Sequence, residues 1–466
     1  MLFKRPPRIK QVEALAFLEN KNAAALFMSM RTGKTKVIID DWQRIGCDLL
    51  VIAPATVYKV WERALHDDAL KMPRLLIWES GVTKALVVRA FEQHVGPRVL
   101  LVNIEALSTV ETVRSLCVSF VKQRPTMVVI DESVVIKNHR AQRTKFINTQ
   151  LAPFAAYRRI LSGLPTPRSP LDIFSQFWFL NPGILKCRTY DQFLREYAHT
   201  KRMRAGGRSF NVVTGYKNID QLYAKLAPHQ IRVRLEDCTD LPKADYKILE
   251  VRLTKEQTRV YDEVRKYCTA QLANKKFITP GTVVTQLLRL QQVLLGRAVA
   301  EDDTVLTFPE YRIASLLEFL NSTDEKVVIF ATEKLDIVKI TNALQREFGI
   351  GSVANFTGDN RATREEEEQT FRNNIDCRFM VSTYSAGGMG RPWDVASIVV
   401  FYSPTQDYGL REQGEARPLA VGKTTPVLYV DMICPNTVET KWLKALRVKM
   451  NLAAQITGDA WREWVV

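Results

Sequence analysis

Two series of short apolar segments, separated by amphipathic stretches, constrain the fold of this chain more than any other feature. Near-continuous apolar runs are typical of parallel strands covered by helices on both faces, because a strand that faces water on one side alternates apolar and polar residues. Amphipathic stretches at residues 58–70 and 110–122 supply such helices. The first part of the chain is therefore predicted to be an α/β domain. Its strand-like segments are residues 48–53, 74–78, 98–103, 126–130 and 158–162.

A second series of the same kind occupies the C-terminal part of the chain. A chain of 466 residues exceeds what one hydrophobic core usually serves. We therefore expect two parallel-sheet domains, at residues 1–180 and 276–466. The second series has strand-like segments at residues 326–331, 351–356, 377–382, 397–402 and 427–432, and helix-like segments at residues 333–347, 363–373 and 437–452.

The segment between the two domains, residues 181–275, is predicted to be a helical, basic insertion and linker. Within it, residues 246–252 are expected to form a strand and residues 255–272 a helix. Its most basic part is Lys201-Arg202-Met203-Arg204, beside Gly206-Gly207. This basic run either grips a phosphate backbone or forms a mobile surface loop, and the loop is the favoured interpretation.

A candidate phosphate-binding loop lies near the N-terminus. Residues 23–28 form an apolar run, Gly33 permits a turn, and an amphipathic segment begins at Thr35. A strand, a loop and the N-terminus of a helix in this order bind anions through free backbone N–H groups. Lys34 would then reach the β- and γ-phosphates, and the Thr35 hydroxyl would hold Mg²⁺. Because Met28 occupies the first glycine position of the full pattern, an ordinary strand-to-helix turn stays open as the alternative.

An acidic pair, Asp131-Glu132, directly follows the predicted strand at residues 126–130. Ligands of parallel sheets bind at the carboxyl ends of the strands, where the phosphate loop and Asp131 would both emerge. There Asp131 can hold Mg²⁺, and Glu132 can orient or deprotonate an attacking water. Two solvated acids at a strand end are the alternative, which loses weight as further motifs follow in order.

The charge of the chain points to a polyanionic partner. The formal net charge is +16, and the basic residues are spread along the chain from Lys4 to Lys449 rather than gathered in one tail. Such an excess favours nucleic acid as the partner, the alternative being a basic surface that only aids solubility.

The cysteines and the apolar runs bear on compartment. Seven widely separated cysteines without a C-x-x-C pair, together with five histidines, disfavour a structural zinc site and fit a reducing cytosol. No apolar run approaches the ~20 residues of a membrane helix. We expect a soluble, intracellular protein with no membrane partner.

Ten segments, in order along the chain, together resemble the superfamily 2 helicase-like ATPases, in particular their Swi/Snf branch and its compact phage and bacterial members. The resemblance covers the chain from residue 8 to about residue 466. The segments are residues 10–11, 30–35, 51–61, 103–107, 131–138, 162–176, 287–292, 356–359, 383–390 and 413–422.

The resemblance implies two RecA-like lobes with ATP in the cleft between them, and hydrolysis coupled to translocation on DNA, more often duplex than single-stranded. Strand separation is compatible with it, and the implied location is a bacterial or phage-infected cytosol. ATP and Mg²⁺ are the implied ligands. The implied catalytic residues are Lys34, Asp131, Glu132 and Arg417. The implied Mg²⁺ ligands are Thr35 and Asp131. Nucleotide binding falls on Gln11, Arg31, Thr32, Gly33, Lys34, Thr35, Gly390 and Gln413. Nucleic-acid contacts fall on Thr56, Lys59, Asn103, Thr383, Ser385 and Arg391.

Three positions depart from the family pattern. The third motif of the family corresponds to residues 162–176, and Leu164 stands where it usually has threonine. The acidic box corresponds to residues 131–138, and Val134 stands where it often has histidine. In the sixth motif Arg417 fills the first arginine position, but Ala420 fills the second. An arginine finger contributes a factor of about 10³ or more in rate. The alternative function is therefore an ATP- and DNA-binding module with little or no turnover, unless Arg391 or Lys423 replaces the missing arginine.

Overall fold

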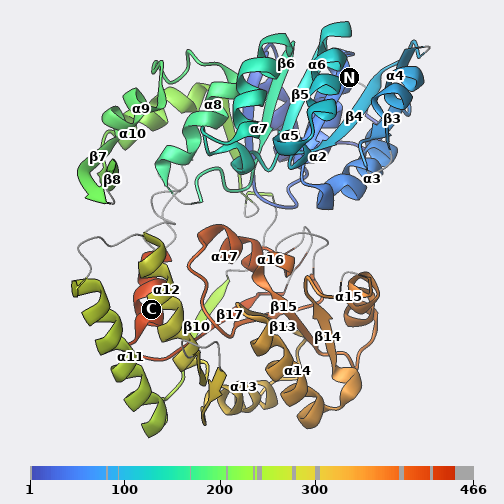
Figure 1. Ribbon diagram of the computed structural model, residues 1–466. Helices are drawn as coiled ribbons and strands as arrows, with labels where there is room; N and C mark the ends of the chain where they lie inside the picture. The colour runs from blue at the N-terminus through green and yellow to red at the C-terminus, as the bar shows by residue number, and fades with distance from the viewer. Residues whose placement is uncertain are drawn as a thin grey trace. The chain divides into compact units, whose positions relative to one another are not determined.

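The computed structural model describes residues 3–79, 82–92, 94–167, 169–205, 208–234, 237–238, 244–274, 280–299, 305–360, 362–387, 393–419, 423 and 425–446. The chain divides into two compact units (Figure 1). Most of the first unit is residues 1–200 and 213–240, and most of the second is residues 241–450.

The described residues of the first unit form a seven-stranded sheet in the order β3-β4-β2-β5-β6-β1-β9, and every pairing in it is parallel. All residues of β2 and β5 are buried, as is typical of strands covered on both faces. The predicted parallel sheet is therefore confirmed. Its strands are β1 Ala23–Met28, β2 Asp48–Ala53, β3 Arg74–Ile77, β4 Arg98–Asn103, β5 Thr126–Asp131, β6 Tyr157–Leu161 and β9 Gln230–Val233.

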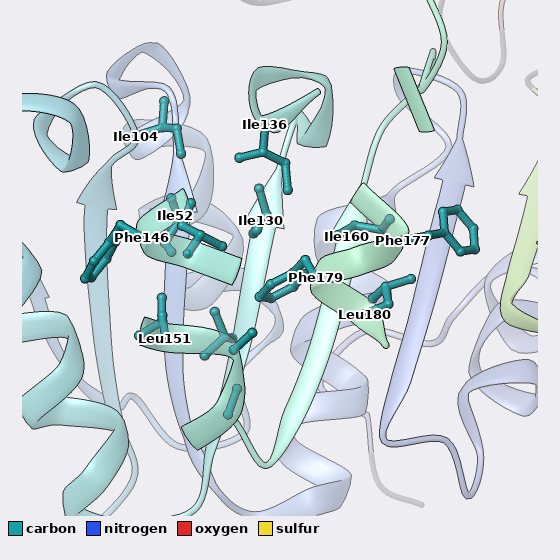
Figure 2. Close-up of a cluster of buried hydrophobic side chains, with 14 of the residues drawn as sticks. Ile52, Ile104, Ile130, Ile136, Phe146, Leu151, Ile160, Phe177, Phe179 and Leu180 are labelled. Atoms are coloured by element: carbon teal, nitrogen blue, oxygen red, sulfur yellow. The ribbon is translucent and has the colours of Figure 1, made fainter. Parts of the chain in front are cut away.

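Helices cover both faces of this sheet and enclose two hydrophobic cores. Figure 2 shows one core, in which Ile52, Ile130 and Ile160 of the sheet face Phe146 and Phe179 of the covering helices. Burying each such side chain contributes about 1.5–3 kcal/mol to the free energy of unfolding. One face is covered by α1 Ile9–Leu18, α2 Lys34–Ile45 and α3 Tyr58–Asp68. The other is covered by α4 Lys84–Glu92, α5 Ala106–Thr109, α6 Glu111–Gln123, α7 Gln142–Phe146 and α8 Phe174–Leu180.

The segment at residues 181–275 differs from the expected helical insertion. Two of its strands join the sheets: β9 pairs with β1, and β10 pairs with β17 of the second unit. The basic run at residues 201–204 lies in a strand of an antiparallel hairpin rather than in a surface loop, because the backbone groups of its two strands pair with each other. The remaining elements here are α9 Tyr190–Tyr197, β7 Ala198–Ala205, β8 Arg208–Tyr216, α10 Ile219–Leu226 and α11 Lys255–Asn274.

The described residues of the second unit form a six-stranded parallel sheet in the order β10-β17-β16-β13-β15-β14, as expected from the second series of apolar segments. Its strands are β10 Asp245–Glu250, β13 Val327–Ala331, β14 Val353–Phe356, β15 Phe379–Thr383, β16 Ile398–Phe401 and β17 Leu428–Ile433. A two-stranded sheet pairs β11 Arg297–Val299 with β12 Val305–Thr307. The helices of the second unit also include α12 Pro280–Leu294, α13 Arg312–Asn321, α14 Lys334–Phe348, α15 Arg364–Asn373, α16 Tyr384–Gly387 and α17 Tyr408–Glu415.

A buried arginine fastens the carboxyl ends of two strands in this second sheet. Arg312 donates through Nη1 to the Met432 carbonyl at 3.0 Å and through Nη2 to Glu439 Oε2 at 2.6 Å, and it also bonds to the Tyr402 carbonyl. A guanidinium and a carboxylate buried together in this way compensate each other's charge.

Among the described residues, no helix is both long and apolar enough to cross a bilayer.

Candidate active site

The phosphate loop has the predicted order of strand, loop and helix. Strand β1 ends at Met28, and helix α2 begins at Lys34 after Gly33, whose φ of 87° lies in the left-handed region. A Cβ at Gly33 would lie 2.1 Å from Gln11 Nε2, so a side chain here would also have to displace the Gln11 carboxamide. Arg31 likewise has a positive φ of 67°. The tight turn places the N-terminus of α2 directly after the loop, and helix N-termini bind anions through their backbone N–H groups.

Gln11, predicted to bind nucleotide, contacts the phosphate loop itself. Its Oε1 accepts from the Arg8 backbone N–H at 2.9 Å, and its Nε2 donates to the Thr32 carbonyl at 3.1 Å. The Thr32 hydroxyl in turn donates to the Ser29 carbonyl at 2.8 Å. Both side chains are almost fully buried. In this structure Gln11 and Thr32 therefore support the shape of the loop.

The acidic pair and the phosphate loop meet, although they are 98 residues apart in the chain. Lys34 Nζ lies 2.8 Å from Glu132 Oε1, and both side chains keep limited contact with solvent, with exposed fractions of 13% and 20%. Glu132 has a φ of 52°, which a residue with a Cβ rarely adopts. Sparsely populated backbone conformations of this kind concentrate at functional sites.

Asp131 is held on both of its carboxylate oxygens. Oδ2 accepts from the indole Nε1 of Trp61 at 2.9 Å, and Oδ1 accepts from the Glu132 backbone N–H at 3.0 Å. Burial raises the pKa of the Asp131 carboxyl, and the positive charge of Lys34 opposes that rise. Trp61 ends the segment at residues 51–61, in which Thr56 and Lys59 are the predicted nucleic-acid contacts. The sequence carries no signal for its contact with Asp131.

The available ligand atoms fit Mg²⁺ bound together with phosphate. Thr35 lies in the first turn of α2 and Asp131 at the end of β5, and they offer a hydroxyl and a carboxylate. Mg²⁺ prefers oxygen ligands and is usually held by one or two carboxylates plus substrate phosphates. The described part of the chain contains no cluster of three or more His, Cys, Asp or Glu that could hold a metal without such help.

The nucleic-acid residues predicted in the first unit follow neighbouring strands. Lys59 is exposed on α3, after β2, and Asn103 ends β4, which pairs with β2. Because the strands are parallel, both residues lie toward the carboxyl edge of the sheet. The Asn103 side chain accepts from the Glu105 backbone N–H at 2.9 Å. The side chain of Thr56 lies outside the described residues.

In the second unit, Thr383 and Ser385 likewise lie at the carboxyl end of a parallel strand or just after it. Thr383 ends β15, and its hydroxyl oxygen accepts from the Ala386 backbone N–H at 3.4 Å. Ser385 is exposed in α16. Gly390, Arg391 and Ala420 lie outside the described residues.

Arg417 is buried within the second unit. Its guanidinium lies 4.5 Å from the centre of the Trp393 ring, and its carbonyl accepts from the Trp393 backbone N–H at 2.8 Å. Gln413 is half-buried in α17.

Lys423, considered above as a replacement for the missing arginine, donates to the Asp394 and Ala396 carbonyls at 2.6 and 2.7 Å, and burial lowers its pKa. Its ammonium is therefore already engaged by main-chain oxygens.

Comparison with known proteins places these motifs in a family context. Residues 9–297 match the SNF2-related domain. A Caenorhabditis elegans protein, described as a SWI/SNF-related matrix-associated actin-dependent regulator of chromatin subfamily A-like protein 1 homolog, is 22% identical over 96% of this chain and 61% of its own length. An uncharacterized ATP-dependent helicase of Mycoplasma pneumoniae is 22% identical over 94% of this chain and 40% of its own length. The chain thus spans about two to three fifths of these curated relatives.

Among solved structures, the Sulfolobus solfataricus SWI2/SNF2 ATPase core in complex with dsDNA is similar to this chain. It is 20% identical, and the match covers 98% of this chain and 95% of that one, with a TM-score of 0.42.

Proposed function

The chain belongs to the SNF2-related domain family of helicase-like ATPases, and from this premise we propose that it hydrolyses ATP in response to DNA and uses the reaction to translocate on duplex DNA. The observation that carries the proposal is the ion pair between Lys34 and Glu132, 2.8 Å long, beside the buried carboxylate of Asp131. A candidate phosphate-binding cation (Lys34), a candidate base (Glu132) and a candidate metal ligand (Asp131) thus lie together at one edge of a parallel sheet.

In the proposed reaction, Lys34 exchanges Glu132 for the β- and γ-phosphates, and the amides at the start of α2 bind the same phosphates. Mg²⁺, held by Thr35 and Asp131, would neutralise charge on the phosphate oxygens. Once Lys34 has moved to the phosphates, the Glu132 carboxylate orients a water molecule and accepts its proton. The ion pair is therefore a resting arrangement of two groups that act separately during turnover.

The second unit is proposed to contribute Arg417 and Gln413. The guanidinium of Arg417 would neutralise charge on the γ-phosphate, as arginine fingers do. Its place over the Trp393 ring supports this role, because the face of an indole attracts a guanidinium and so restricts its movement. Arg417 lies in the same segment as Ala420, so hydrolysis in this chain would depend on one arginine of the pair.

DNA binding is proposed to involve the hairpin of β7 and β8 in addition to Lys59, Asn103, Thr383 and Ser385. Residues 198–217, which include this hairpin, contain five Lys or Arg and no Asp or Glu. Lys201 and Arg202 are exposed in β7. Uncompensated positive charge on an exposed hairpin favours contact with phosphates, and such contacts are independent of sequence and sensitive to salt.

The nucleic-acid dependence is tested by measuring ATP hydrolysis with duplex DNA, single-stranded DNA, RNA or no nucleic acid, at two salt concentrations. We expect the largest stimulation with duplex DNA. Replacing Lys201 and Arg202 together by serine should raise the DNA concentration that gives half-maximal stimulation. It should also reduce the slope of log affinity against log salt by roughly 2, since each phosphate contact contributes about 0.9.

In that experiment the rate without nucleic acid should stay the same in the double serine variant. Arg259→Ser is the control, because this exposed arginine of α11 is already paired with Glu263 at 2.9 Å. It should leave the salt slope unchanged. A wild-type rate that no nucleic acid alters would contradict the proposed function.

The contact between Trp61 and Asp131 gives a second prediction. Trp61→Phe keeps an aromatic ring at this buried position, although a smaller one, and removes the N–H that bonds to Asp131 Oδ2. We expect kcat to fall about three- to tenfold. The free energy of unfolding should fall by about 1.5–3 kcal/mol, the range for one hydrogen bond to a charged group. Steady-state kinetics and thermal denaturation measure the two effects.

Trp42→Phe is the matched control for this change. Trp42 of α2 is also buried, but its indole N–H donates to the carbonyl of Cys47, just after that helix, at 2.6 Å. It should lower stability by a similar amount and leave kcat unchanged. An equal loss of turnover in both variants would mean that the Trp61 indole matters only through packing.

A further inference from the structure

A buried glutamine joins the acidic box to the loop that follows β6, residues 162–166, here called the β6 loop. Gln176 lies in α8 and has no exposed surface. Its Oε1 accepts from the Ser133 hydroxyl at 2.7 Å, and its Nε2 donates to the Pro165 carbonyl at 2.7 Å and to the Asp172 carbonyl at 2.9 Å. One carboxamide thus holds segments that leave two neighbouring strands, β5 and β6.

The β6 loop also contacts the strand that leads into the phosphate loop. Arg232 Nη1 donates to the Gly163 carbonyl at 2.7 Å and to the Phe27 carbonyl at 3.2 Å. A Cβ at Gly163 would lie 3.7 Å from the Met28 carbonyl oxygen and from the Met30 amide nitrogen. The β6 loop is therefore in contact with both parts of the nucleotide site.

The neighbouring departures from the family pattern make this connection more important in this chain. Val134 in the acidic box and Leu164 in the β6 loop carry apolar side chains, which make no hydrogen bonds. Gln176 and Ser133 supply a polar connection between the same two segments. Because Gln176 and Ser133 are both buried, the hydrogen bond between them is strong and costly to break, so the two segments are held together tightly.

We propose that Gln176 is a positioning residue that makes the acidic box and the β6 loop move as one, so that a change at Glu132 during the ATP cycle reaches the β6 loop. The hydrogen bond to Ser133 acts directly beside Glu132 in the chain, and the hydrogen bond to Pro165 transmits the displacement. This inference rests on the proposed ATPase function, and it concerns how the nucleotide site communicates rather than how it binds.

The test compares Gln176→Leu, Ser133→Ala and the double variant with the wild type. We expect kcat in the presence of DNA to fall about tenfold in Gln176→Leu, the size expected when one buried hydrogen bond is lost from a transition state, with the KM for ATP unchanged. The double variant should be no slower than Gln176→Leu, because both changes break the same network. Independent, multiplicative losses would overturn the proposal.

Gln257→Leu is the matched control in the second unit. Gln257 is also buried, accepts from the Thr254 backbone N–H at 3.0 Å and donates to the Val293 carbonyl at 3.2 Å. It should lower thermal stability as Gln176→Leu does and leave kcat unchanged. A similar loss of kcat in this control would show that Gln176 matters only for folding.

Hydrogen–deuterium exchange separates this inference from the proposed function. A non-hydrolysable ATP analogue should slow exchange of the β6 loop amides in the wild type and fail to do so in Gln176→Leu. That result supports the coupling even if DNA does not stimulate hydrolysis, in which case only the proposed function fails. No response of the β6 loop in the wild type, or the same response in the variant, overturns the coupling.

Discussion

Replacing Lys34 by alanine is expected to lower kcat/KM for ATP hydrolysis by about 10²–10³-fold, the usual effect of removing a preorganised charge from a reacting centre. In the structure Lys34 is paired with Glu132 at 2.8 Å and also opposes the burial of the Asp131 charge. Without it, two carboxylates would face an incoming polyphosphate with one cation fewer. Phosphate release and the binding of a fluorescent nucleotide should both report the loss.

Lys36→Ala is the control for this experiment. Lys36 lies two positions further along α2, and its ammonium is paired with Asp40 at 2.7 Å. Removing it leaves the buried Asp40 without that partner, so stability should fall while kcat/KM stays within a few-fold of the wild type. Hydrolysis that persists unchanged in Lys34→Ala would rule out the phosphate loop as the site of the reaction.

The second large effect is expected from Glu132→Gln. This change removes the carboxylate that would accept the proton of the attacking water and keeps the size of the side chain, so kcat should fall about 10²–10⁴-fold, the range for a general base. The KM for ATP should stay the same or fall, because the ion pair that holds Lys34 away from phosphate is weakened. Single-turnover kinetics and nucleotide binding separate the two effects.

This variant also distinguishes the two functions considered from the sequence. An ATP- and DNA-binding module without turnover would show the same negligible rate in the wild type and in Glu132→Gln. Glu105→Gln, which alters an exposed carboxylate of the same unit, is the control and should keep the wild-type rate.

The sheets were predictable from the sequence because their strands are buried on both faces. Continuous apolar runs locate β2 and β4 at their observed bounds and the other predicted strands to within about two residues. The hairpin of β7 and β8 was missed because charged residues in its first strand hide the strand pattern. Its strands flank Gly206-Gly207, and two runs joined by Gly-Gly are a hairpin signal that the sequence does contain.

The candidate site was predictable only in part. Lys34, Asp131 and Glu132 were found because their motifs are local in the chain. The contacts of Trp61 and Gln176 depend on which strands are neighbours: α3 follows β2, which pairs with β5, and the β6 loop follows β6, which pairs with β5 on its other side. No local pattern encodes such neighbours, so residues that support a site from adjacent strands become visible only in the folded chain.

The place of β9 in the first sheet has a consequence for biosynthesis. Strand β1, which leads into the phosphate loop, has β6 on one side and β9 on the other, and Leu26 pairs there with Ile231. At a synthesis rate of about 5–20 residues per second, roughly 10–40 s separate the emergence of these two partners from the ribosome. During that interval one side of β1 is an unpaired apolar edge, the kind that recruits other chains. The nascent first unit is therefore most exposed to aggregation just before its last strand arrives.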